Sequence, residues 1–165
     1  MSNSAYLLVK FNDKQKLPDA IKQLQDENMF ENYDAVDGHY HLVIKEVDHN
    51  DATLAKVKSF DGFSEMSVCI IETDNQNKDF MLDETNTYTY LFIEAEDKMR
   101  ETLLEKMQSF SETLFVSPTS GPYNIVGLVQ HETFDKIDRF IKTEINNLDG
   151  ILRFKQDHVL FLDRI

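Results

Sequence analysis

The chain carries the stretch Gly38-His39-Tyr40-His41-Leu42-Val43-Ile44, and a similar stretch begins 83 residues later as Gly121-Pro122-Tyr123-Asn124-Ile125-Val126-Gly127. Each stretch places a glycine two residues before a tyrosine and continues with apolar residues. One such stretch is typical of any buried strand, but two at matching places in a 165-residue chain indicate an internal repeat. We therefore predict that the chain consists of two copies of one small domain.

Hydrophobic periodicity predicts the same order of elements in both copies. Apolar residues alternate along 5–11, which is typical of a strand, and 17–27 carries Leu17, Ile21 and Leu24 on one helical face. The other expected strands lie at 32–36, 39–46, 67–72, 88–94, 112–116, 123–130 and 153–163, and the other expected helices at 54–60, 97–110 and 134–148. The order strand, helix, strand, strand, helix, strand predicts the α+β class, with two tandem ferredoxin-like βαββαβ domains and antiparallel sheets.

A polar and aperiodic segment, 74–87, separates the copies, so we predict domains at 1–73 and 88–165 that are joined by this linker. The last strand of each domain is apolar at consecutive positions, 68–71 and 159–162, which is expected when both faces of a strand are covered. The simplest cover is the sheet of the other copy. We therefore expect the sheets to pack face to face, within one chain or between two chains, as in dimeric α+β barrels.

Charge and cysteine content argue against several classes of protein. The net charge is −13, and nucleic-acid affinity comes largely from cations that neutralise phosphates, so we expect no direct binding to DNA or RNA. Cys69 is the only cysteine, which excludes an intrachain disulfide and favours a reducing compartment. The apolar run at 5–9 is too short for a signal segment or a membrane span. We therefore expect a cytoplasmic protein without a membrane partner.

Two short motifs occur once in each copy. The first joins glycine and tyrosine ahead of an apolar strand, as Gly38-His39-Tyr40-His41 and Gly121-Pro122-Tyr123-Asn124. The second ends a helix, as Phe60-Asp61-Gly62-Phe63 and Leu148-Asp149-Gly150-Ile151. In this order they resemble the ligand-binding domain, or RAM domain, of the leucine-responsive (Lrp/AsnC) transcription regulators. The family carries aspartate after the tyrosine, where this chain has His41 and Asn124, and we expect its DNA-binding helix-turn-helix to be missing here.

The resemblance implies a sensing and oligomerisation module, related to these regulators, that acts without direct DNA binding. Its implied ligand is a small-molecule effector, with amino acids as the first candidates. The resemblance also implies a homo-oligomer, or association with Lrp/AsnC-type regulators. On this basis we expect a protein that is not an enzyme.

The candidate ligand-binding residues belong to the two repeated hairpins. A glycine allows a ligand to approach the backbone, and the tyrosine beside it can present a hydroxyl. The alternative is that the glycine only satisfies the turn and the tyrosine fills the sheet. Because Asn124 keeps an acceptor oxygen in place of the family's aspartate, and His41 does not, we expect the second hairpin to keep the pocket. The candidates are Gly38, Tyr40, His41, Gly121, Tyr123 and Asn124.

Histidines raise the question of a metal or a catalytic base. His39 and His41 are two positions apart on an expected strand and would face one side, but no third ligand lies at a suitable spacing. We predict no catalytic residues, no metal and no cofactor. The alternative function is a dimeric α+β barrel enzyme, either a cofactor-free monooxygenase or a haem-using relative, in which His39, His41 or His158 serves as base or ligand.

One acidic cluster remains, formed by Glu94, Glu96 and Asp97 at an expected junction between a strand and a helix. Carboxylates are favoured at helix N-termini, where they cap backbone N–H groups and interact with the helix dipole. We therefore assign this cluster to helix capping.

Overall fold

The computed structural model describes residues 4–27, 30, 32–73 and 82–161. The first half (residues 4–73) contains β1 (Ala5–Phe11), η1 (Lys14–Lys16), α1 (Leu17–Glu27), β2 (Asn32–Asp37), β3 (Leu42–Glu46), α2 (Asp51–Lys58) and β4 (Phe63–Ile71). The second half (residues 82–161) contains β5 (Thr87–Ala95), η2 (Asp97–Met99), α3 (Arg100–Gln108), β6 (Thr113–Ser120), β7 (Ile125–His131), α4 (Phe134–Phe140), η3 (Ile141–Ile145) and β8 (Ile151–Leu160). The predicted α+β class is confirmed, and the order βαββαβ occurs twice. Origin by duplication and the domain bounds at 1–73 and 88–165 stay predictions.

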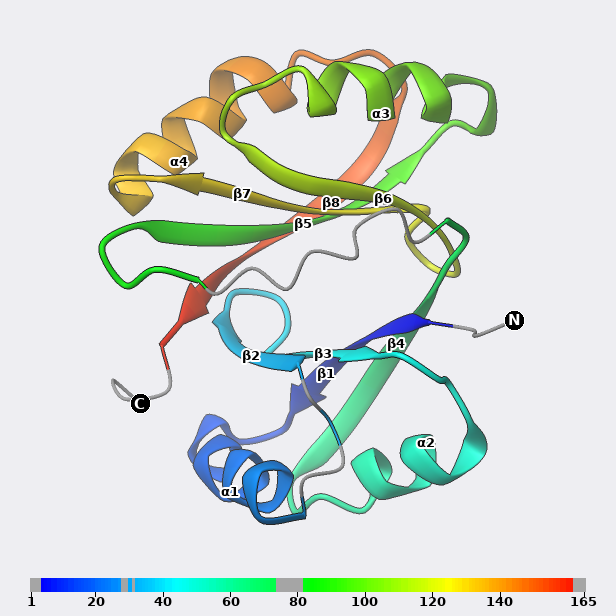
Figure 1. Cartoon of the computed structure of the whole chain (residues 1–165), viewed down its shortest axis with the longest axis vertical. Coiled ribbons are helices and arrows are strands. Elements are labelled where there is room, and N and C mark those ends of the chain that lie inside the picture. Colours follow the sequence, from blue (N-terminus) through cyan, green and yellow to red (C-terminus); the bar gives the residue numbers. More distant parts are fainter. Residues whose placement is uncertain (1–3, 28–29, 31, 74–81, 162–165) are drawn as a thin grey trace.

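The eight strands form one closed barrel within a single chain, in the order β1-β3-β2-β8-β5-β7-β6-β4. Each half contributes a four-stranded antiparallel sheet, and the two sheets join at both edges (Figure 1). The β4–β6 seam pairs Ile70 with Ser120 and Ile71 with Thr119. The β2–β8 seam pairs three residues, from Ala35 opposite Leu160 to Asp37 opposite His158. The two sheets therefore pack face to face within one chain.

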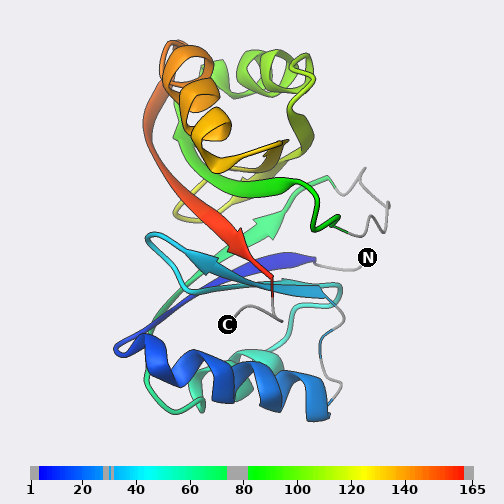
Figure 2. The same ribbon diagram turned by 90° about the vertical axis from the view of Figure 1, so that its left-hand side faces the viewer.

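Three apolar cores hold this arrangement together. The two helix pairs cover the outer faces of the sheets, α1 and α2 on one side and α3 and α4 on the other (Figure 2). Buried side chains such as Leu24 and Val57 fill the first outer core, and Leu103 and Ile137 fill the second. Full burial of each such side chain stabilises the fold by roughly 1.5–3 kcal/mol. The inner core between the sheets contains Tyr6, Leu8, Val36, Tyr40, Val43, Cys69, Ile71, Tyr88, Tyr90, Phe92, Phe115, Tyr123, Val126, Leu128 and Val159.

Several element bounds differ from the sequence-based expectation. The strand expected at 39–46 begins at Leu42, because residues 38–41 form a hairpin loop. The strand expected at 112–116 continues to Ser120, because β4 offers a pairing partner across the seam. The helix expected at 134–148 changes after Phe140 into one turn of π-helix, η3. Part of the expected linker, 74–81, lies outside the described residues, and β5 begins at Thr87.

No helix in the described part of the chain has the length and apolar composition needed to cross a membrane.

Candidate functional site

The glycine of each repeated hairpin lies against the last strand of the other half. Gly38 has a φ of 153° and Gly121 a φ of 135°, in a region that side-chain-bearing residues avoid. A Cβ on Gly38 would overlap the Oδ1 atom of Asp157, and a Cβ on Gly121 would overlap the carbonyl oxygen of Val68. Both glycines therefore permit close contact between the two halves of the barrel.

Asp157 on β8 fixes the first hairpin to the second half. Its carboxylate accepts hydrogen bonds from the backbone N–H groups of His39, at 2.6 Å, and Tyr40, at 3.0 Å. Burial raises the pKa of Asp157 to about 6, although these two donors favour its charged form. At the matching place in the other half, the thiol of Cys69 interacts with the backbone N–H of Tyr123, and burial raises the pKa of this thiol to about 11. The hairpins thus dock in the same way on different side chains.

Tyr40 and Tyr123 point into the inner core. Each is only 2% exposed, and their hydroxyl oxygens are 3.4 Å apart. The hydroxyl of Tyr40 is also hydrogen-bonded to Ser67 at 2.9 Å. Burial raises the pKa of Tyr40, so its hydroxyl stays protonated at neutral pH. The structure places both tyrosines in the packing between the sheets, and a contact between them and a ligand stays a prediction.

His41 and Asn124 perform the same local function in the two halves. The strands β1 and β5 each have an irregular register near their ends. Nδ1 of His41 accepts a hydrogen bond from the backbone N–H of Phe11 at 2.9 Å. Oδ1 of Asn124 accepts one from the N–H of Ala95 at 2.8 Å, and its Nδ2 donates to the carbonyl of Ala95 at 2.9 Å. His41 carries no acceptor oxygen, but its ring nitrogen accepts the hydrogen bond at the corresponding place.

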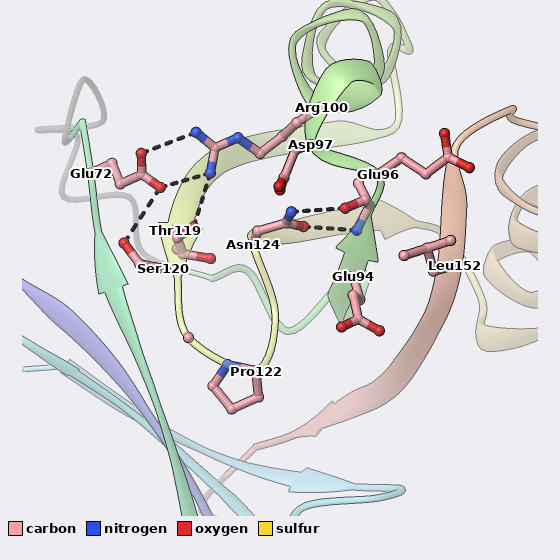
Figure 3. Close-up of a pocket in the computed structure, with 12 residues that line it drawn as sticks. Glu72, Glu94, Glu96, Asp97, Arg100, Thr119, Ser120, Pro122, Asn124 and Leu152 are labelled. Carbon is pink, nitrogen blue, oxygen red and sulfur yellow. Dashed lines mark hydrogen bonds and ion pairs between the residues drawn. The ribbon is translucent and has the colours of Figure 1, made fainter.

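A cleft of about 470 Å³ opens beside the second hairpin (Figure 3). It is built by the end of β4, the junction between β5 and α3, the turn between β6 and β7, and the start of β8. Its lining residues are Glu72, Glu94, Ala95, Glu96, Asp97, Arg100, Thr119, Ser120, Gly121, Pro122, Asn124 and Leu152. Gly121 and Asn124 were expected at a pocket and do line this one, whereas Tyr123 points away from it into the inner core.

Arg100 joins the two halves across the cleft. Its Nη1 and Nη2 atoms donate to the two carboxylate oxygens of Glu72 at 2.7 and 3.0 Å, and Nη1 also donates to the carbonyl of Thr119 at 3.1 Å. The ion pair lowers the pKa of Glu72. A second ion pair at the cleft links Glu94 to Arg153 at 3.0 Å. Two of the four carboxylates in the lining therefore already have a cationic partner.

The other two carboxylates, on Glu96 and Asp97, make no hydrogen bond or ion pair within the described part of the chain. Neither caps the following helix through its side chain, so the capping part of the expectation is wrong. Asp97 does lie in the first turn of η2, where a carboxylate interacts favourably with the helix dipole. Figure 3 shows the Asp97 carboxylate directed into the cleft, between Arg100 and Asn124. The cleft thus presents one unoccupied carboxylate next to a guanidinium.

The histidines do not assemble into a metal site. His39 lies in the hairpin loop rather than on a strand, and the ring of His41 is engaged with Phe11. His158 is hydrogen-bonded to Thr89 at 2.7 Å. Among the residues that the structure describes, no group of three or more His, Cys, Asp or Glu side chains has a geometry that could hold a metal ion.

No pattern in the sequence predicted Glu72 and Arg100 as site residues. Glu72 follows a strand next to the expected linker, and Arg100 begins a helix 28 residues later. Only the β4–β6 seam brings them together. Asp97 did carry a signal, since it belongs to the acidic cluster.

Neither a known protein family model nor a curated protein sequence matches this chain. Among solved structures, the chain is similar to an anthrone oxidase-like protein, with a TM-score of 0.59, 10% identity and coverage of 98% of this chain and 92% of the other. It is also similar to a "putative monooxygenase" from Fusobacterium nucleatum, with a TM-score of 0.55, 12% identity and coverage of 96% and 91%. AsnC from E. coli matches over 52% of this chain and 61% of its own, with a TM-score of 0.45 and 19% identity.

These similarities show the fold. The match to AsnC covers about half of the chain. Of the matches over nearly the whole chain, these two carry enzyme names, and a third is a "major regulator of staphylococcal pathogenesis", with a TM-score of 0.53, 8% identity and coverage of 95% and 98%. The fold is thus shared with proteins that carry enzyme names. The expectation that the protein is not an enzyme is therefore wrong.

Proposed function

We propose that the chain binds a small molecule with an ammonium group, of the amino-acid or amine class, in the cleft beside Gly121 and Asn124. The observation that carries this proposal is the Asp97 carboxylate, which is directed into the cleft and has no partner in the described part of the chain. The volume of about 470 Å³ is within the range of small-molecule sites.

Charge favours a cationic group in the ligand. The lining has four carboxylates and one guanidinium, so its potential is negative and attracts an ammonium ion. Because Asp97 is exposed, its ion pair with the ligand contributes only about 0.2–1 kcal/mol.

The Arg100 guanidinium favours an amino acid over a simple amine. A guanidinium has five N–H donors, and its contacts with Glu72 and Thr119 use three of them. The remaining two N–H donors have no partner in the described part of the chain and suit the carboxylate of a zwitterion. Asp97 and Arg100 would then bind the two charged groups of one ligand.

Calorimetric titration tests this proposal. The panel contains amino acids, the matching amines without the carboxylate, and the matching acids without the ammonium group. We expect binding of amino acids to the wild type, and a Kd about 1.4- to fivefold higher for Asp97→Asn, equivalent to about 0.2–1 kcal/mol. Asp51→Asn is the matched control, because Asp51 is also exposed in the first turn of a helix but lies outside the cleft.

The outcomes separate clearly. Equal affinity for the wild type and Asp97→Asn, or binding of the acids alone, would contradict the proposal. Mass spectrometry of the recovered ligand shows in the same experiment whether the protein converts it.

Self-association and association with Lrp/AsnC-type regulators stay predictions. The closed barrel uses the inner faces of both sheets within one chain, so an oligomer would have to form through other surfaces. Sedimentation velocity with and without the bound amino acid tests whether the ligand changes the oligomeric state.

A further inference from the structure

Four basic side chains from distant parts of the sequence gather at the end of the barrel where the two hairpins meet. They are Lys10 on β1, His39 in the first hairpin, and Arg153 and Lys155 on β8. We propose that this group, the barrel-end cluster, binds a small oxyanion, that is, a molecule with a phosphate or carboxylate group. None of the four side chains lines the proposed amine-binding cleft, although Arg153 is bound to Glu94 at its edge.

The two hairpin tyrosines form the floor of the barrel-end cluster. The Arg153 guanidinium lies 5.1 Å from the centre of the Tyr123 ring. On the other side, the His39 ring meets the Tyr40 ring edge to face, with 4.7 Å between their centres. The hydroxyls of the two tyrosines are 3.4 Å apart. Arg153 and His39 therefore flank one continuous aromatic surface.

Strand geometry brings Lys155 to the same place. Side chains alternate along a strand, so Arg153, Lys155 and Asp157 share one face of β8. On that face, Oδ1 of Asp157 accepts a hydrogen bond from the backbone N–H of His39 at 2.6 Å. Lys155 lies between these two neighbours and therefore faces the hairpin.

Lys10 completes the barrel-end cluster from the first sheet. It shares a face of β1 with Leu8, which belongs to the inner core, and it pairs in register with Glu65. Burial has the largest effect in lowering the pKa of His39, and the nearby charges of Lys10, Lys155 and Arg153 lower it further, while the carboxylate of Glu65 acts in the opposite direction. The four basic residues thus surround one point at the barrel end.

The cationic charge of this cluster is incompletely neutralised. Lys10 and Lys155 are half-buried, and neither has an ion pair or hydrogen bond in the described part of the chain. The carboxylate of Glu94 is already bound to Arg153, and Glu65 makes no ion pair with Lys10 despite their register. A third carboxylate, on Asp157, lies near Lys155 but is occupied by the backbone N–H groups of His39 and Tyr40. Half-buried like charges repel each other and lose hydration. An oxyanion between them would remove both costs, in a protein whose net charge of −13 otherwise disfavours anions.

Isothermal titration calorimetry with inorganic phosphate and with malonate, each against sodium chloride of equal ionic strength, tests this site. We expect the wild type to bind at least one of the two oxyanions. The titration that shows binding identifies phosphate or carboxylate as the preferred group. The double variant Lys10→Gln/Lys155→Gln should bind at least tenfold more weakly. Its matched control is Lys22→Gln/Lys58→Gln, which removes two exposed lysines from helices α1 and α2.

A second readout locates the bound anion. An anion stabilises protonated histidine, so phosphate or malonate should raise the pKa of His39 in an NMR titration, while the double variant should show no such rise. The proposal is overturned if neither anion binds the wild type, if both double variants bind equally, or if the His39 pKa does not respond. Asp97→Asn should leave oxyanion binding unchanged. The experiments can therefore refute the proposal for the barrel-end cluster without refuting the proposal for the cleft, and the reverse.

Discussion

The substitution Gly121→Ala tests the contact between the two halves most sharply. Gly121 has a φ of 135°, and a Cβ on it would overlap the carbonyl oxygen of Val68 in the other half. The unfavourable backbone conformation costs about 1–3 kcal/mol. The overlap with a backbone atom adds about 1–3 kcal/mol, because strand β4 has to move away from β6.

The expected loss of stability for Gly121→Ala is therefore about 2–6 kcal/mol, a large part of the roughly 5–15 kcal/mol that stabilises a typical domain. Gly62→Ala is the matched control. Gly62 also has a positive φ, of 83°, but its Cβ would meet side chains of the same half, nearest that of the half-buried Lys16 and then Oδ1 of Asn12, rather than a backbone atom of the other half.

Urea unfolding followed by circular dichroism measures both variants. We expect Gly62→Ala to lose about 1–2 kcal/mol, and Gly121→Ala to lose about 1–3 kcal/mol more, because of the overlap with the Val68 carbonyl. Equal losses for the two variants would refute the reasoning that Gly121 is needed for contact between the halves.

Three further predictions concern the residues around the hairpins. Burial lowers the pKa of His41, so the unfolded chain binds more protons below pH 6.5 and the wild type should lose stability, relative to His41→Asn, as the pH falls from 7 to 5 in urea titrations. Asn124→Leu leaves the N–H of Ala95 without its partner and should cost about 1–3 kcal/mol in the same assay at pH 7, whereas no loss would contradict the hydrogen bonds described for Asn124. Arg100→Gln removes a partly exposed ion pair with Glu72, so thermal unfolding should show a loss below about 1 kcal/mol, and a much larger loss would mean that this pair holds the seam closed.

Local patterns in the sequence were sufficient for most of the fold. Alternation along 5–11 and the apolar face of 17–27 correspond to β1 and α1 as observed. The consecutive apolar positions at 68–71 indicated that the last strand is covered on both faces, and the inner core shows that Cys69 and Ile71 do face the opposite sheet. These predictions succeeded because they depend on side-chain periodicity, which is a local property.

The seams between the halves escaped prediction because they depend on contacts distant in sequence. The segment 117–121 lies between the strands expected at 112–116 and 123–130, but residues 117–120 continue β6 where it meets β4. Arg100 and Glu72 lie on opposite sides of the same seam. No local pattern indicates such a pairing, so the cleft was located by its hairpin and not by its charged residues.

The roles of the hairpin residues could be predicted only in part. Gly121 and Asn124 do line a cleft, but the repeated glycine and tyrosine also serve the packing between the halves. Tyr40 and Tyr123 are buried, as the packing alternative for these residues required. Contact between the halves and ligand binding can both require glycine and tyrosine at these positions. The sequence alone therefore does not distinguish the two roles.

Mapping of backbone and side-chain amide shifts by NMR during titration with an amino acid tests the proposed cleft most directly. The proposal predicts that the Asn124 side-chain amide and the backbone amides of residues 94–100, 119–121 and 123–124 shift together, with one saturation curve that weakens in Asp97→Asn. Shifts confined to helices α1 and α2, or no shift at millimolar amino acid, would contradict it.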